Sequence, residues 1–187
     1  MAHSKLSGLI IKVSAIFEND LRIVIFSAEQ GQQSFIAKRA HKRKLSGKLM
    51  VGNIVTLYFQ KSRQNAFLSD CDIQTPLPEI RKDLNKISLL FYIINIIQHV
   101  TTYNQSNPDL YELLIHTCKC LNTQNNLPHL KQEFETQILI KEGLYNPQVM
   151  PEQFKTIFET YTGKTLKAPL SEIKSPATSS FINKTVN

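Results

Sequence analysis

The chain has 187 residues, 42% of them hydrophobic, and its 22 Lys and Arg residues outnumber 15 Asp and Glu residues for a formal net charge of +7. This length and apolar content suit one large domain or, as we prefer, two small ones, and they exclude a chain that needs disulfide or metal staples to fold. Three cysteines behind a polar, non-signal-like N-terminus exclude a secreted disulfide framework and favour a reducing cytoplasm.

Up to about Thr75 the pattern is that of strands. Short runs of β-branched and aromatic residues cover residues 9–13, 21–26, 34–38, 53–60 and 66–73. In the fourth run apolar and polar residues alternate, which is typical of a strand with one buried face. Gly31 supplies a hairpin turn between the second and third runs. Five short antiparallel strands predict a small closed barrel of the OB type, with an SH3-like barrel as the alternative.

After Pro76 and Pro78 the period becomes helical. Residues 84–100 carry their polar side chains on one narrow stripe, which predicts a helix that lies centrally among others. Three further helices are expected to begin near Pro108, Pro128 and Pro151. The stretch 87–100 is interrupted by polar residues and is too short to span a membrane, so no span is expected.

The sequence thus predicts an α+β chain in three parts. An N-terminal five-stranded OB-fold β-barrel covers residues 1–75, and an all-α helical domain covers residues 76–167. Residues 168–187 are rich in Ser, Thr and Pro and too poor in apolar residues to order themselves, which predicts a flexible tail.

Positive charge is concentrated in the first part. Up to Thr75 there are 11 basic and 5 acidic residues, whereas the rest of the chain has 11 and 10. No acidic residue lies between Glu29 and Asp70. An uncompensated basic segment favours a polyanion, because Lys and Arg that reach phosphates release counterions. The alternative is a solvated charge run. The predicted nucleic-acid-binding residues are Lys38, Arg39, Lys42, Arg43, Lys44, Lys48, Lys61, Arg63 and Tyr58.

Aromatic residues are interleaved with these cations. Phe35, Phe59 and Phe67 can either fill the barrel or offer faces on which bases stack, and the core role is favoured for each. Tyr58 is the best candidate for an exposed stacking face, because it occupies a polar position of the alternating strand.

Other constellations point to ordinary structure. His116 and Cys120 share a helix face, but no second pair of ligands follows, so a core role is favoured and no metal or other cofactor is expected. Glu18 and Asp20 fit a turn cap or a cation partner better than acid–base chemistry. The sequence has no phosphate loop and no nucleophile elbow, so no enzyme is expected.

The order of parts resembles a known family. The likeness lies in GLIIKV (8–13), ENDLRIV (18–24) and FSAEQG (26–31) running into FIAK (35–38), and later in PDLYELL (108–114), FE (134–135) and EGLYNP (142–147). Over roughly residues 6–147 the chain is similar to the RecO family, bacterial recombination mediators that act in DNA repair.

The resemblance implies an N-terminal OB-fold, a helical domain and a non-enzymatic role. Members bind single- and double-stranded DNA, anneal complementary strands, and work with RecR to load recombinase onto DNA covered by the single-stranded-DNA-binding protein, whose C-terminal tail they contact. The matching basic positions are Lys38, Arg43 and Lys44, with Arg39, Lys42 and Lys48 beside them. A bacterial cytoplasmic, nucleoid-associated location is then expected.

Two features depart from the family. Many members carry a four-cysteine zinc module after a segment like that around Tyr145, whereas no cysteine follows it here, so zinc is not expected. Arg39 stands where members often have glycine. Two other functions stay open: an RNA-binding OB-fold protein of translation or ribosome assembly, and a protein-only adaptor.

Overall fold

The computed structural model describes residues 4–62, 64–147 and 153–167. Arg63 and the tail 168–187 lie outside the described residues. The strands are β1 (Ser4–Phe17), β2 (Asp20–Ser27), β3 (Gly31–Ala37), β4 (Ile54–Lys61) and β5 (Ala66–Thr75). They are followed by the 3-10 helix η1 (Pro78–Lys82) and the α-helices α1 (Leu84–Val100), α2 (Pro108–Thr123), α3 (Leu127–Lys141) and α4 (Phe154–Thr162).

The strands close into one barrel in the order β1-β2-β3-β5-β4. Neighbouring strands are antiparallel except β3 and β5, which pair in parallel through Ile36 and Phe67. β1 pairs with β4 from Ser4 to Leu9 and with β2 from Leu9 to Phe17, so a single long strand closes the barrel. This arrangement confirms the OB-type barrel and excludes the SH3-like alternative.

The barrel interior is filled by alternate residues of its strands. Phe35 and Phe59 are each 2% exposed, and their ring centroids lie 4.8 Å apart in an edge-on contact. These two aromatics therefore belong to the core, as favoured above. Gly31 takes a positive φ of 64° and forms the predicted turn between β2 and β3.

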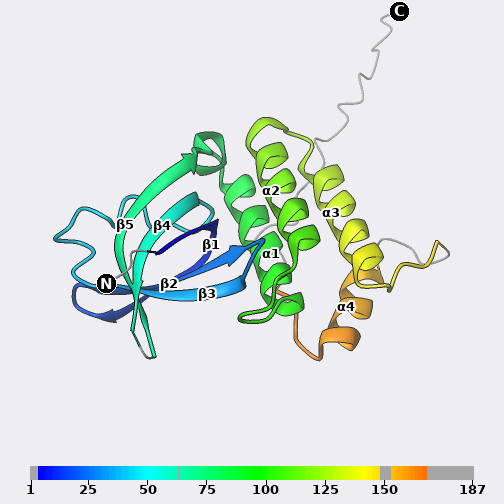
Figure 1. Cartoon of the computed structure of the whole chain (residues 1–187). Coiled ribbons are helices and arrows are strands. Elements are labelled where there is room, and N and C mark those ends of the chain that lie inside the picture. Colours follow the sequence, from blue (N-terminus) through cyan, green and yellow to red (C-terminus); the bar gives the residue numbers. More distant parts are fainter. Residues whose placement is uncertain (1–3, 63, 148–152, 168–187) are drawn as a thin grey trace, which may run out of the picture.

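Helix α1 lies between the barrel and the other helices, as Figure 1 shows, which confirms its predicted central position. Asp83 caps its start by accepting hydrogen bonds from the backbone N–H groups of Asn85 and Lys86. One hydrophobic cluster continues from the outer barrel wall into the helices, and it includes Val24 and Phe26 together with Ile93 and Ile97 of α1. The predicted division into two domains stays a prediction.

Polar contacts also tie the barrel to the helices. The Gln32 side chain donates to the carbonyl oxygen (3.0 Å) and hydroxyl (2.8 Å) of Thr101. Ser106 donates to the carbonyl oxygen of Ala28 at 2.7 Å. The β2–β3 turn is therefore held against the segment after α1.

A buried polar group connects α1 to α3. The hydroxyl of Tyr92 donates to the carboxylate of Glu135, which is 6% exposed, and Lys131 Nζ lies 3.0 Å from the same carboxylate. Burial, reinforced by the negative charge of Glu135, raises the pKa of Tyr92. Each member of this group has a partner, as a buried polar network requires.

Candidate nucleic-acid interface

The basic loop, residues 38–53, links β3 to β4. Its first half lies at the barrel end away from the helices, on the left in Figure 1. Ala40, Leu45 and Leu49 are buried in the barrel core at 0%, 4% and 2% exposure. Because these apolar residues anchor the backbone, the charged residues between them point outward.

The neighbouring turn between β1 and β2 holds the start of the loop. The backbone N–H of Ala40 donates to the carbonyl oxygen of Asn19 at 2.8 Å, and that of Arg39 donates to Asp20 Oδ1 at 2.8 Å. Asp20 therefore caps the start of the basic loop, and not the turn beside it as favoured from the sequence. Arg39 adopts φ 52°, the left-handed conformation that glycine takes most readily.

Four exposed cations of the loop, Lys38, Arg39, Lys42 and Lys44, have no carboxylate within 4.0 Å in the part of the chain that the structure describes. Lys38 Nζ lies 4.4 Å from the centroid of the Phe67 ring, which places Lys38 beside the start of β5. The loop thus carries exposed positive charge that the described acidic residues do not neutralise.

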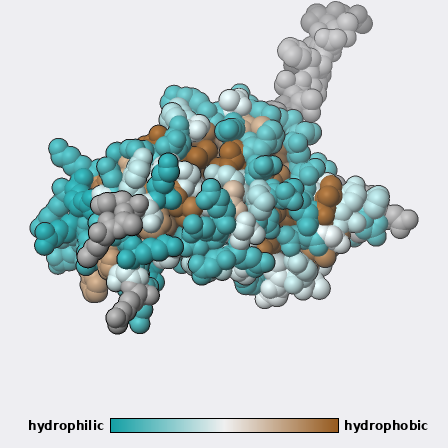
Figure 2. Space-filling view, viewed as in Figure 1, coloured by the Kyte–Doolittle hydropathy of each residue, from teal (hydrophilic) through white to brown (hydrophobic). Residues whose placement is uncertain are grey.

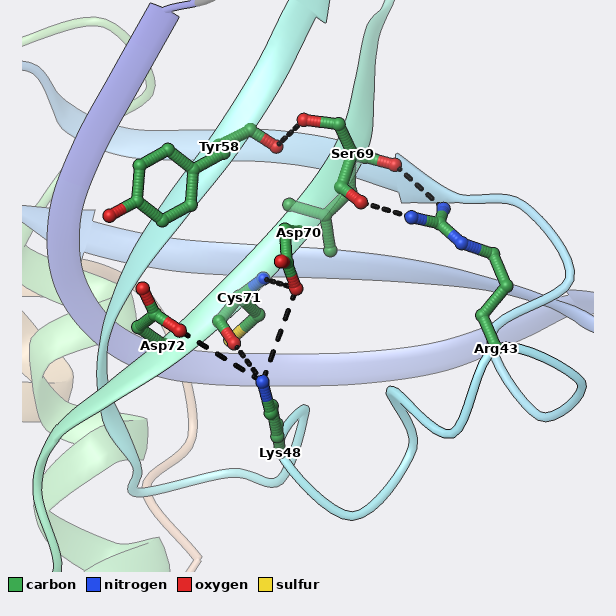
Figure 3. Close-up of polar contacts among 8 residues, drawn as sticks. Arg43, Lys48, Tyr58, Ser69, Asp70, Cys71 and Asp72 are labelled. Carbon is green, nitrogen blue, oxygen red and sulfur yellow. Dashed lines mark hydrogen bonds and ion pairs between the residues drawn. The ribbon is translucent and has the colours of Figure 1, made fainter.

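Arg43 and Lys48 are engaged by β5, as Figure 3 shows. Arg43 donates to the carbonyl oxygens of Leu68 (3.1 Å) and Ser69. Lys48 Nζ donates to the carbonyl oxygen of Cys71 at 2.7 Å. Arg43 therefore holds the loop against the barrel. It forms no ion pair with a carboxylate among the described residues.

The charge of Lys48 is compensated. Its Nζ lies 4.0 Å from Asp70 and 3.9 Å from Asp72, two carboxylates on β5. Asp70 and Asp72 come after the acid-free segment in the sequence, but the fold places both of them beside Lys48. The assignment of Lys48 to nucleic-acid binding stays a prediction, and the structure gives this residue a partner of its own.

Tyr58 and Lys61 lie on β4. Tyr58 is half-buried, and a hydrogen bond with Asp72 raises the pKa of its phenol. In Figure 3 it lies across β5 from Arg43, on the side of Asp72, which also pairs with Lys48. Lys61 is exposed at the end of β4, with Nζ 6.0 Å from the centroid of the Phe59 ring. Their roles in nucleic-acid binding stay predictions.

Phe17 is an exposed aromatic that sequence reasoning missed. Its side chain is 74% exposed at the last residue of β1, beside the turn that holds Arg39. The turn between the first two strands of an OB-fold is a common place for oligonucleotide contacts, and an exposed ring beside cations can stack on a base. The sequence could have indicated this exposure, because Phe17 directly precedes the polar turn that begins at Glu18.

The cysteines lie away from this surface or inside the fold. Burial raises the pKa of Cys71 to about 11 and that of Cys118 to about 12. Cys120 is half-buried, with Sγ 3.4 Å from His116 Nε2. Among the residues that the structure describes, no three His, Cys, Asp or Glu side chains are placed to hold a metal ion. Within the same residues, no helix is both long and apolar enough to cross a membrane.

A closed OB barrel with a basic loop, joined to a helical unit, defines an OB-fold protein of the kind that commonly binds oligonucleotides. Comparison with protein families narrows this class. The family model "Recombination protein O N terminal" matches residues 1–76, and "Recombination protein O C terminal" matches residues 81–147. The chain belongs to the RecO family.

Curated relatives carry the same family name. The DNA repair protein RecO of Acetivibrio thermocellus is 28% identical over 154 residues, which cover 80% of this chain and 60% of the relative. The RecO of Halalkalibacterium halodurans is 27% identical over 143 residues, covering 75% and 56%. That of Syntrophus aciditrophicus is 29% identical over 120 residues, covering 60% and 45%. The matches thus span between 45% and 60% of the length of these relatives.

Proposed function

We propose that this chain acts in DNA repair by holding DNA strands on its basic loop. The observation that carries the proposal is the group of exposed loop cations without carboxylate partners in the described structure. Phosphates are the natural counterions of such a surface, because their binding releases condensed salt ions from the nucleic acid. The relatives' name, DNA repair protein, supports DNA as the polyanion.

The loop is suited to binding because it is already ordered. Its apolar anchors, the bond of Arg39 to Asp20 and the bonds of Arg43 to β5 restrict its backbone before any ligand arrives. Little conformational entropy is then lost on binding. Phe17, beside the same turn, offers a ring face for a base.

The proposed mechanism is electrostatic. Two complementary strands gathered on one positive surface repel each other less and meet at a higher local concentration, which promotes annealing. This role needs no catalytic step.

The same proposal includes the family's partners. The helices would receive RecR and the C-terminal tail of the single-stranded-DNA-binding protein, so that recombinase is loaded onto coated DNA in the bacterial nucleoid. Capture of the coating protein by this chain should be lost when that tail is removed, and capture that survives tail removal would contradict this part of the proposal.

A matched pair of variants tests the DNA role. The loop variant R39Q/K42Q/K44Q and the control K119Q/K141Q/K155Q remove the same charge, but the control residues are exposed on the helices. We expect the loop variant to bind a single-stranded oligonucleotide more weakly and to anneal complementary strands more slowly than the control.

Equal binding and annealing by the two variants would contradict the proposal. Competition with RNA of the same sequence separates the remaining functions. A clear preference for RNA would favour a role in translation or ribosome assembly, because the 2′-hydroxyl distinguishes the two polymers. Affinity for both polymers no better than that of an unrelated basic protein would favour a protein-only adaptor.

A further inference from the structure

An apolar groove runs between β1 and α1, away from the basic loop cations. It has a volume of about 750 Å³, and its walls include Ile11, Lys12 and Val13 of β1 and Ile87 and Phe91 of α1. In Figure 2 hydrophobic surface shows in the middle of the molecule, where the barrel meets the helices.

Large apolar side chains remain uncovered along this groove. Leu84, Phe91 and Tyr103 line it and are 74%, 53% and 55% exposed. Uncovered apolar residues that line one groove are typical of a binding surface, because an isolated exposed residue is ordinary and a contiguous set is not.

Two polar features of the groove also lack hydrogen-bond partners in the described structure. Asn95 lines it, and its Oδ1 is buried without a hydrogen-bond partner among the described residues. Strand pairing of β1 with β4 ends at Leu9. Ile10 is still bonded to Gly52 and Asn53, and the carbonyl oxygen of Ile11 accepts from the Gln98 side chain, so the edge of β1 that faces away from β2 lacks a strand partner in the described structure only beyond Ile11. An extended peptide would complement both, since its backbone supplies N–H donors and can run beside an open strand edge.

The chain itself leads into this groove. Leu166 is 2% exposed, and its backbone N–H donates to Glu159 Oε1 at 2.7 Å, which fixes the chain after α4. The next residue, Lys167, lines the groove. Residues 168–187 therefore start at the groove, and at about 3.3 Å per extended residue they can reach any part of it.

The composition of this segment matches the groove. Leu170 and Ile173 follow Lys167 closely and are apolar, and Glu172, the only acidic residue of the segment, stands between them. Lys12 on the groove wall offers that carboxylate a partner. The segment also carries Lys174 and Lys184, so the match rests on its apolar side chains and on Glu172 alone, and its net charge adds nothing.

We propose that residues 168–187 dock in the groove between β1 and α1, with Leu170 and Ile173 on the apolar wall around Phe91 and a backbone N–H donating to Asn95 Oδ1. The chain then covers its own apolar surface. Val51 of the basic loop lines the groove but none of the loop's cations does, so the inference does not depend on DNA binding.

Tethering makes this docking effective. A segment joined directly to the groove has an effective concentration of about 1 mM, so an intrinsic dissociation constant of about 0.1 mM already gives a docked-to-free ratio of about 10:1. Replacing two buried aliphatic side chains by Ser weakens docking by about 100-fold, which inverts that ratio to about 1:10.

Tryptophan fluorescence tests the proposal on the full chain. The protein has no tryptophan, so F91W places a single reporter in the groove. We expect the emission of F91W to be blue-shifted and protected from acrylamide. Adding L170S/I173S should shift the emission to the red and remove the protection, whereas the control S179A/S180A should change neither.

Identical emission and quenching with and without L170S/I173S would overturn the proposal. Protection that persists in L170S/I173S and rises with protein concentration would assign the groove to a second copy and would also overturn it. Hydrogen exchange at residues 11–13 of the chain without F91W gives an independent readout, and we expect faster exchange in L170S/I173S than in S179A/S180A.

Discussion

If the basic loop binds DNA as proposed, the affinity should depend steeply on the salt concentration. Five of the loop's cations, Lys38, Arg39, Lys42, Arg43 and Lys44, are exposed and lack a carboxylate partner in the described structure. If each neutralises one phosphate, the slope of log K against log salt is about −3.5 for a single strand. Between 50 and 200 mM salt the affinity then falls by about 100-fold.

The variant R39Q/K42Q/K44Q removes three of these charges and leaves Arg43, which braces the loop against β5, in place. The slope should flatten to about −1.4, and the same change in salt should weaken binding by only about sevenfold. Lys48 is left unchanged because Asp70 and Asp72 already compensate it.

Fluorescence anisotropy with a labelled single-stranded oligonucleotide measures the slope at several salt concentrations. The variant K119Q/K141Q/K155Q controls for net charge and should keep the slope of the unmodified chain. If the loop variant also kept that slope, the loop would not be the surface that meets the phosphates, and the reasoning from uncompensated charge would be wrong.

Two predictions concern the fold itself. Gly52 adopts φ 86°, and a Cβ there would lie 2.6 Å from Leu90 Cδ2, so Gly52→Ala should lower the free energy of unfolding by about 1–3 kcal/mol in urea titrations. Gly47→Ala is the control: no atom lies within 4 Å of its Cβ position, and equal losses for both variants would contradict the argument. His99 is half-buried with Nδ1 unpartnered among the described residues, and burial, with Lys164 nearby, lowers its pKa below the ordinary value of about 6.5. The unfolded chain then binds more protons than the folded one, so stability should fall as the pH drops through about 6.5. His99→Leu should make the free energy of unfolding depend less on pH than it does in the control His41→Gln. If the pH dependence were the same in both variants, His99 would not be its cause.

Local patterns predicted most of the elements. Helix α1 was expected over residues 84–100 and has those bounds, because its apolar period and the cap at Asp83 are local features. β1 is longer than the expected run of residues 9–13, since its first residues are ordered by pairing with β4 and its last by pairing with β2. Such pairing joins segments far apart in the sequence, which a local pattern cannot register.

In the candidate site, too, local features could be predicted from the sequence and long-range contacts could not. The basic loop was recognised because its charge density is written in consecutive residues. The compensation of Lys48 by Asp70 and Asp72 depends on which strand lies beside the loop, and the exposure of Phe17 depends on where β1 ends. Both follow from closure of the barrel, which sets neighbours across the sheet.

The apolar cluster that continues from Phe26 into Ile93 and Ile97 joins barrel and helices without an intervening hinge. The loop cations and α4 lie toward opposite ends of this assembly in Figure 1. A change in the packing of Phe26 against α1 would therefore alter how the barrel and the helices sit relative to each other, because close-packed interiors transmit small displacements.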